Sequence, residues 1–171
     1  MNETIYWTFF HEGPWRFLLA ATDKGLCFTG SQEREMDELE TWAAKQFKGS
    51  ILEENAKKLE SYYEEFLQYV NGQRKELTFA LDFKGTDFQR SVWQALQQIP
   101  FGVVITYSDV AEKINKPKAV RAVGTAIGAN PVMVAIPCHR VIGKNGTLTG
   151  FRGGLELKKM LLDLEGKHHT M

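Results

Sequence analysis

Cysteine is scarce in this sequence. Its 171 residues include only Cys27 and Cys138, which lie far apart and form no C-x-x-C motif. This spacing predicts neither a disulfide framework nor a zinc site, and we expect no metal. Long apolar runs are also missing, since no stretch reaches the roughly 18 apolar residues of a membrane-spanning helix and no basic start precedes an apolar run at the N-terminus. We therefore expect a cytoplasmic protein that does not contact a membrane.

Net charge is missing as well, but only over the whole chain. The 21 Lys and Arg residues balance the 21 Asp and Glu residues. Residues 1–84 contain 10 basic and 15 acidic side chains, a balance of −5, whereas residues 85–171 contain 11 and 6, a balance of +5. A basic half is typical of a protein that faces a polyanion, although surface charge also drifts between domains without any function. The C-terminal half is the candidate nucleic-acid-binding part.

The first half of the chain alternates between strand and helix patterns. Runs of β-branched and aromatic residues separated by turns that contain Gly predict strands, and apolar residues at helical spacing predict helices. In chain order, three strands, two helices and a last strand are predicted over residues 4–10, 15–21, 26–29, 33–47, 54–70 and 77–83. We expect residues 1–84 to form a small mixed α/β domain with a structural role.

A domain boundary is predicted near Gly85. Thr86 and Gln89 form a capping box, in which Thr is the N-cap and Gln follows three residues later, so a helix begins here. Two short helices predicted over residues 108–114 and 119–128 are joined by a tight turn, which is the pattern of a helix-turn-helix. We expect residues 85–171 to be a mostly helical domain, which makes the whole chain an α+β protein.

The main candidate for chemistry is the run from Ile136 to Val141, Ile-Pro-Cys-His-Arg-Val. Pro137 fixes its own φ angle and favours an extended residue before it, so Cys138 should lie at a rigid corner. The thiolate is the reactive form of Cys, and a neighbouring imidazole or guanidinium lowers the pKa of a thiol. The competing interpretation, from composition alone, is that Cys138 is a small buried apolar residue.

Many further residues extend this pattern over about half of the chain. In order, the residues and motifs are Gly85-Thr86, Phe88, Trp93, Ile99-Pro100, Gly102, Tyr107, Arg121-Ala122-Val123-Gly124, Asn130-Pro131, Pro137-Cys138-His139-Arg140-Val141, Gly150, Gly153-Gly154-Leu155, Leu161-Leu162 and Glu165-Gly166. This ordered set resembles the O6-alkylguanine-DNA alkyltransferase family. The resemblance implies a ribonuclease H-like N-terminal domain and a winged helix-turn-helix C-terminal domain that binds DNA and accepts the alkyl group.

The resemblance also implies an activity, which is DNA repair by direct and irreversible transfer of an alkyl group. Cys138 would take a methyl or larger group from O6-alkylguanine, and also from O4-methylthymine, in double-stranded DNA. In the family, His139 accepts the thiol proton through a water and Glu165 orients the imidazole. Tyr107 donates to the leaving base, and Asn130 ties the recognition helix to the Cys loop. The implied protein is a monomer without a cofactor, and each molecule acts once.

Two further groups of residues follow from the same resemblance. Arg121 would fill the gap that a flipped nucleotide leaves in the duplex, and Tyr107 would steer that nucleotide. The other implied DNA contacts are Ala122, Gly124 and Thr125. The implied substrate pocket consists of Pro137, Val141, Phe151, Arg152 and Gly153. Arg152 replaces a small residue and Gly128 stands where several members carry a basic side chain, so the sequence does not predict the largest alkyl group that fits.

Two other interpretations of the sequence stay open at this point. A damage-recognition module of the alkyltransferase-like type keeps the DNA-binding frame but typically carries Trp in place of the reactive Cys. A Cys-His hydrolase needs an oxyanion hole and a separate His, for which the adjacent Cys138 and His139 are poorly placed. A stable methyl thioether on Cys138 after incubation with methylated DNA would distinguish the three.

Overall fold

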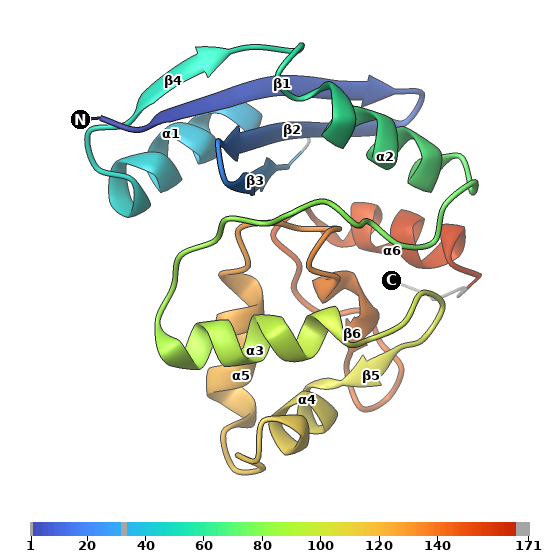
Figure 1. Cartoon of the computed structure of the whole chain (residues 1–171). Helices are drawn as coiled ribbons and strands as arrows, with labels where there is room; N and C mark the ends of the chain where they lie inside the picture. The colour runs from blue at the N-terminus through green and yellow to red at the C-terminus, as the bar shows by residue number, and fades with distance from the viewer. Residues whose placement is uncertain (1, 32–33, 167–171) are drawn as a thin grey trace. The chain divides into compact units, whose positions relative to one another are not determined.

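The computed structural model describes residues 2–31 and 34–166, which divide into two compact units, Met1–Lys84 and Gly85–Met171 (Figure 1). The first unit is a mixed sheet with two helices, and the second is mostly helical, so the predicted α+β class is confirmed. None of the helices in the described residues has the length and apolar character needed to cross a membrane.

The N-terminal unit is built on a four-stranded sheet with the order β3-β2-β1-β4 (Figure 1). Its elements are β1 Thr4–Glu12, β2 Trp15–Thr22, β3 Gly25–Gly30, α1 Glu35–Gln46, β4 Ile51–Glu54 and α2 Glu60–Val70. The first three strands form the predicted antiparallel meander, and β4 pairs in parallel with β1. Short turns explain the meander, because antiparallel neighbours need only a tight connection.

Alternating side chains on β2 explain why a helix lies on each face of this sheet. Leu18 joins the apolar cluster that contains Leu39 of α1. The residue before it on the strand, Phe17, faces the other way and contacts Phe10 and Phe66, the latter on α2. Because successive residues of a strand point to opposite faces, the two clusters lie on the two sides of the sheet.

Two sequence-based predictions for this unit are wrong. The second helix begins at Glu60 and not at Glu54, because residues 51–54 pair with β1 as an edge strand. Residues 77–83, all of which the structure describes, form no regular strand, and only Leu81 bridges to Leu26. The alternation in that segment reflects packing, since Phe79 contacts the rings of Tyr62 and Phe66.

The C-terminal unit surrounds a short parallel pair of strands with helices. Its elements are α3 Asp87–Gln97, β5 Ile105–Thr106, α4 Tyr107–Lys113, α5 Val120–Gly128, the 3-10 turn η1 Cys138–Arg140, β6 Val141–Ile142 and α6 Leu155–Leu164. The predicted capping box is present, with Thr86 and Gln89 bonded to each other in both directions. Trp93 of α3 is buried and donates its indole N–H to the carbonyl of Ala126 on α5 at 2.8 Å, which fixes the helix that follows the turn.

The pair β5 and β6 links two functional segments. Ile105 pairs with Val141 and Thr106 with Ile142, so Tyr107 follows one strand and η1 precedes the other. Thr106 is the N-cap of α4 and forms a second capping box with Asp109. Because the two strands are parallel, the start of α4 lies at the carboxyl end of this small sheet and η1 at its amino end, and the sheet holds both in place.

Candidate active site

Cys138 lies at a sharp corner of the chain. Pro137 has φ −79° and ψ 63°, and the Cys138 N–H donates to the carbonyl of Ile136 at 2.7 Å. These values describe an inverse γ-turn, which a proline ring favours because it fixes φ. Cys138 then opens the single turn η1 and is only 4% exposed. The rigid corner expected from the sequence is present.

The segment before this corner is held by Asn130. Its side-chain Nδ2 donates to the Ile136 carbonyl and its Oδ1 accepts from the Val132 N–H, both at 2.9 Å. Val134, inside this loop, has φ 76°, a left-handed conformation that costs a β-branched residue about 1–3 kcal/mol. Because Asn130 follows the end of α5, its side chain ties the helix to the Cys138 turn.

The environment of Cys138 acts on its pKa in both directions. Burial raises the pKa of the thiol, whereas the hydrogen bond with Asn130 and the nearby cations Arg152 and Lys158 lower it. Burial is the largest effect and the net pKa is raised, so the expectation of a lowered value is wrong for the free protein. The resting group is therefore a thiol, and its proton must be removed when it reacts.

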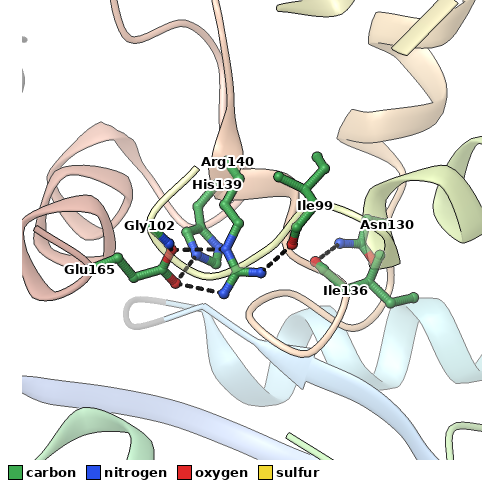
Figure 2. Close-up of polar contacts among 7 residues, drawn as sticks. All are labelled: Ile99, Gly102, Asn130, Ile136, His139, Arg140 and Glu165. Carbon is green, nitrogen blue, oxygen red and sulfur yellow. Dashed lines mark hydrogen bonds and ion pairs between the residues drawn. The ribbon is translucent and has the colours of Figure 1, made fainter. Parts of the chain in front are cut away.

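Glu165, just after α6, is the centre of a buried polar network (Figure 2). Its Oε2 lies 2.8 Å from Nε2 of His139. Arg140 grips both oxygens of the same carboxylate, with Nε at 2.8 Å from Oε1 and Nη2 at 2.9 Å from Oε2. The Gly102 N–H donates to Oε1 at 3.2 Å, and the third arm of Arg140 donates to the Ile99 carbonyl at 2.7 Å. These bonds leave the carboxylate and the guanidinium in one orientation.

The network fixes the protonation of His139. Burial alone would raise the pKa of Glu165, but the hydrogen bonds from His139 and Arg140 outweigh it and hold the carboxyl ionised. Burial lowers the pKa of His139 despite the opposing effect of Glu165, so the imidazole is neutral. A carboxylate only accepts, so Nε2 carries the proton. The buried Nδ1 has no hydrogen-bond partner among the described residues, and its lone pair is free to accept a proton.

Tyr107, Phe151, Arg152 and Gly153 lie on two segments of the C-terminal unit. The hydroxyl of Tyr107, the first residue of α4, is 2.8 Å from Oγ1 of Thr149. Arg152 donates to the carbonyls of Asn130 and Pro131, each at 3.2 Å, and so joins the loop to the end of α5. Gly153 has no room for a side chain, because a Cβ there would lie 2.9 Å from the ring of Phe151 and 2.7 Å from Leu157.

Apart from Tyr107, which opens α4, the residues expected to contact DNA lie on α5. Arg121, Ala122 and Thr125 are exposed, and Gly124 is half-buried. Gly124 faces Tyr107, because a Cβ on it would lie 3.9 Å from the tyrosine ring. Arg121, Ala122 and Thr125 also line a groove of about 650 Å³ with residues of α3. The exposed face of the second helix of the helix-turn-helix is therefore separate from the buried network at Glu165.

Two residues of this site were not assigned a role from the sequence. Arg140 holds Glu165, although its place beside His139 suggested only an effect on the thiol. Lys158 of α6 is fully buried, and its Nζ donates to the carbonyls of Val141 at 2.7 Å and Thr149 at 3.0 Å. The available signal for Lys158 was its spacing, three and four residues before the inward-facing Leu161 and Leu162.

Comparison with known proteins gives the family. Residues 87–167 match the model of the 6-O-methylguanine DNA methyltransferase DNA binding domain, and residues 5–83 match the model of the ribonuclease-like domain of the same proteins. The chain belongs to the 6-O-methylguanine DNA methyltransferase family. The predicted family and its two-domain architecture, ribonuclease-like and then DNA-binding, are thereby confirmed.

Relatives and solved structures of this methyltransferase family cover nearly the whole chain. The inducible methylated-DNA–protein-cysteine methyltransferase of Bacillus subtilis is 56% identical over 162 residues, which cover 95% of this chain and 90% of that protein. The methylated-DNA–protein-cysteine methyltransferase of Methanosarcina acetivorans is 37% identical and covers 95% and 99%. The crystal structure of Mycobacterium tuberculosis O6-methylguanine methyltransferase has a TM-score of 0.80 at 34% identity and covers 94% and 92%. A complex of the Mycobacterium tuberculosis protein OGT with DNA has a TM-score of 0.76 at 32% identity, covering 95% and 92%.

Proposed function

We propose that this protein is a methylated-DNA–protein-cysteine methyltransferase that repairs O6-alkylguanine in double-stranded DNA by moving the alkyl group to Cys138. The carrying observation is the constrained Cys138 corner beside a neutral His139 whose other nitrogen is held by Glu165. This is an arrangement of nucleophile, base and orienting group. O4-methylthymine presents the same kind of alkyl ether and is a second substrate.

The reaction follows from the protonation states at the site. The Cys138 proton passes to Nδ1 of His139 through a water, and the resulting imidazolium is stabilised by ionised Glu165. The Sγ–carbon bond forms while the carbon–O6 bond breaks, and that electron pair stays on the guanine. Tyr107 donates a hydrogen bond to the leaving base and so offsets its developing negative charge. Asn130 holds the Cys138 turn in a fixed position relative to α5, the second helix of the helix-turn-helix.

DNA binds through the C-terminal unit. A base inside the duplex hides its O6 substituent from a side chain as short as Cys, so the nucleotide must leave the stack. The exposed Arg121 on α5 fills the gap that the flipped nucleotide leaves in the duplex. Ala122, Gly124 and Thr125 lie against the DNA groove. Phe151, Arg152 and Gly153 form one wall of the pocket, and Pro137 and Val141 the other. The unit of residues 1–84 is structural.

A thioether is stable under mild conditions, so each chain acts once and needs no cofactor. We place this monomeric protein in the cytoplasm, where reducing conditions keep Cys138 a thiol. To test the function, a duplex with one O6-methylguanine in a restriction site is mixed with increasing amounts of protein, and the restored cleavage is measured. We expect cleavage to saturate at one repaired duplex per chain. No restored cleavage, or many duplexes repaired per chain, would contradict the proposal.

The role of Arg121 has a separate test. Arg121→Ala should slow methyl transfer from the duplex much more than transfer from free O6-methylguanine base, because the free base needs no flipping. Single-turnover rates on both substrates measure the two effects. The exposed Arg90 of α3 provides a matched control as Arg90→Ala. Equal losses on duplex and free base would place Arg121 in the pocket or in the fold, and not in the DNA.

A further inference from the structure

The hydroxyl of Tyr107 has a specific partner on another segment of the C-terminal unit. It lies 2.8 Å from Oγ1 of Thr149, and either oxygen of this pair can be the donor. Both residues are half-buried. Thr149 lies eight residues after Val141, the last residue of the Cys motif. The proposed reaction gives it no role.

Tyr107 is held firmly at its backbone and its ring. It is the first residue of α4, directly after the N-cap Thr106, which accepts from the Asp109 N–H and is paired in β5 with Ile142 of β6. On the recognition helix, a Cβ at Gly124 would lie 3.9 Å from the ring. What these contacts leave undetermined is the direction of the O–H bond, because a phenol hydroxyl rotates to suit its partners.

Thr149 is itself placed by its neighbours. Leu148, the residue before it, is buried in a small cluster with Ile142 and Leu162. The Gly143 N–H donates to the Thr147 carbonyl at 3.0 Å, which closes the turn that leads to Thr149. These contacts hold the loop, and with it Thr149, in a fixed position.

Lys158 completes a closed ring of contacts. Its buried ammonium donates to the Thr149 carbonyl and to the Val141 carbonyl, and Val141 pairs with Ile105, two residues before Tyr107. Starting from Tyr107, the ring runs through Thr149, Lys158 and Val141 and returns along β5. An ammonium has three N–H donors and no acceptor, so this buried group can only pull backbone carbonyls towards itself.

We propose that Thr149 is a positioning residue that sets the donor direction of the Tyr107 hydroxyl for the leaving guanine. When the base occupies the pocket, the Tyr107 O–H donates to it, and the Thr149 O–H then becomes the donor to the tyrosine oxygen. As the carbon–O6 bond breaks, negative charge grows on the base and draws the tyrosine proton, so the bond from Thr149 strengthens in the transition state. No proton leaves Thr149. This inference rests on the proposed function, since it needs guanine as the leaving group.

The test uses Thr149→Val, which keeps the shape and removes the hydroxyl, with Thr149→Ser as the matched control that keeps it. Single-turnover methyl transfer from an O6-methylguanine duplex should fall about tenfold in Thr149→Val, the effect of one hydrogen bond to a group that gains charge, and stay near wild type in Thr149→Ser. In a Tyr107→Phe background, Thr149→Val should cause little further loss. Reaction of Cys138 with iodoacetamide, which expels iodide and no base, should be unchanged.

Each other outcome would count against the inference in a recognisable way. A wild-type rate in Thr149→Val, or an equal loss in Thr149→Ser, would show that the Thr149 hydroxyl does not contribute to the transfer rate. A tenfold loss that persists in the Tyr107→Phe background, or a matching loss with iodoacetamide, shows that Thr149 supports the fold of the loop and not the direction of Tyr107. If the wild-type protein itself transfers no methyl group, the proposed function fails and the inference fails with it.

Discussion

Cys27 in the N-terminal unit and Cys138 in the C-terminal unit are both buried and both free. Cys27 lies on β3 inside the apolar cluster against α1. Burial raises its pKa, and the negative charges of Asp82 and Glu3 raise it further. Burial also raises the pKa of Cys138, but there a hydrogen bond with Asn130 and the charges of two cations work in the opposite direction.

The comparison shows that burial does not by itself decide what a cysteine does. Cys27 is surrounded by apolar side chains and the nearest charges disfavour a thiolate, so it serves as a packing residue. Cys138 is equally enclosed, but it adjoins a neutral imidazole with a free nitrogen and cations that favour a thiolate. The distinction lies in the neighbours, and the following changes test the two thiols and the groups around them.

The largest expected effect comes from replacing each of the two cysteines by alanine in separate variants. Cys138→Ala should abolish methyl transfer and leave DNA binding largely intact, because the thiol is the acceptor and not a major contact. Cys27→Ala should transfer at the wild-type rate, with only a modest loss of stability. Radiolabelled methyl transfer and DNA binding measured on both variants check this, and transfer that survives in Cys138→Ala would remove the distinction between the two cysteines.

The next largest effect concerns the carboxylates near the two cysteines, which are Glu165 in the network beside Cys138 and Asp82 near Cys27. Glu165→Gln leaves the buried Arg140 without its counter-charge and His139 without its orienting group, so transfer should fall strongly and the free energy of unfolding should drop by about 3–5 kcal/mol. Asp82→Asn, the matched change near Cys27, should leave transfer unchanged. Denaturant unfolding and single-turnover rates measure both. A Glu165→Gln protein with normal transfer would show that His139 needs no orienting carboxylate.

A smaller effect is expected from the cation beside Cys138. Burial lowers the pKa of Lys158 to about 8 from 10.5, so the folded state releases this proton earlier than the unfolded state. The penalty for the buried charge is complete below pH 8 and is relieved as the pH rises towards 10.5, by an amount on the order of 3 kcal/mol. The raised pKa values of Cys27 and Cys138 lower the stability over the same pH range in every variant, so the free energy of unfolding is compared between proteins from pH 7 to 10. Wild type and the half-buried control Lys159→Met should both gain stability relative to Lys158→Met as the pH rises. Parallel pH curves for all three proteins would contradict the assignment.

The smallest effect is the cost of the product. A methyl group on Cys138 adds volume to an enclosed site next to the Asn130 tie, and overpacking of this kind costs about 1–3 kcal/mol. The methylated protein should melt at a lower temperature than the free protein and release the repaired DNA. Calorimetry before and after reaction measures the change, with Cys138→Ala and the same DNA as control. An unchanged or raised melting temperature would refute the strain and leave the chemistry intact.

The fold was predictable where local signals were strong. The meander, the capping box at Thr86 and the two helices of the helix-turn-helix follow from turns, caps and periodicity. The strand β4 was not predicted because Ile51–Glu54 is short, lies at the sheet edge and ends in two acids that resemble a helix start. The strands β5 and β6 have two residues each, too few for any period. Residues 77–83 show the reverse error, since alternation reports which side chains are buried and not which backbone groups pair.

The site was predictable as a set of residue types but not as a network. The run from Pro137 to Val141 indicated the nucleophile and its base. The two-armed grip of Arg140 on Glu165 joins residues 25 positions apart, and no local pattern encodes that meeting. The raised pKa of Cys138 depends on how deeply the tertiary structure encloses it, which adjacent residue types do not report. Thr149 and Lys158 gained roles only when their contacts with Tyr107 and Val141 were visible.

Locating the transferred group tests directly whether Cys138 is the alkyl acceptor. The wild-type protein is incubated with an excess of duplex that contains O6-methylguanine, and its intact mass and peptide map are then measured. We expect a plateau at one added methyl group per chain, all of it as a thioether on Cys138 and none on Cys27. A methyl group on Cys27 or another residue, a plateau well above one, or repaired DNA with no change in protein mass would contradict it.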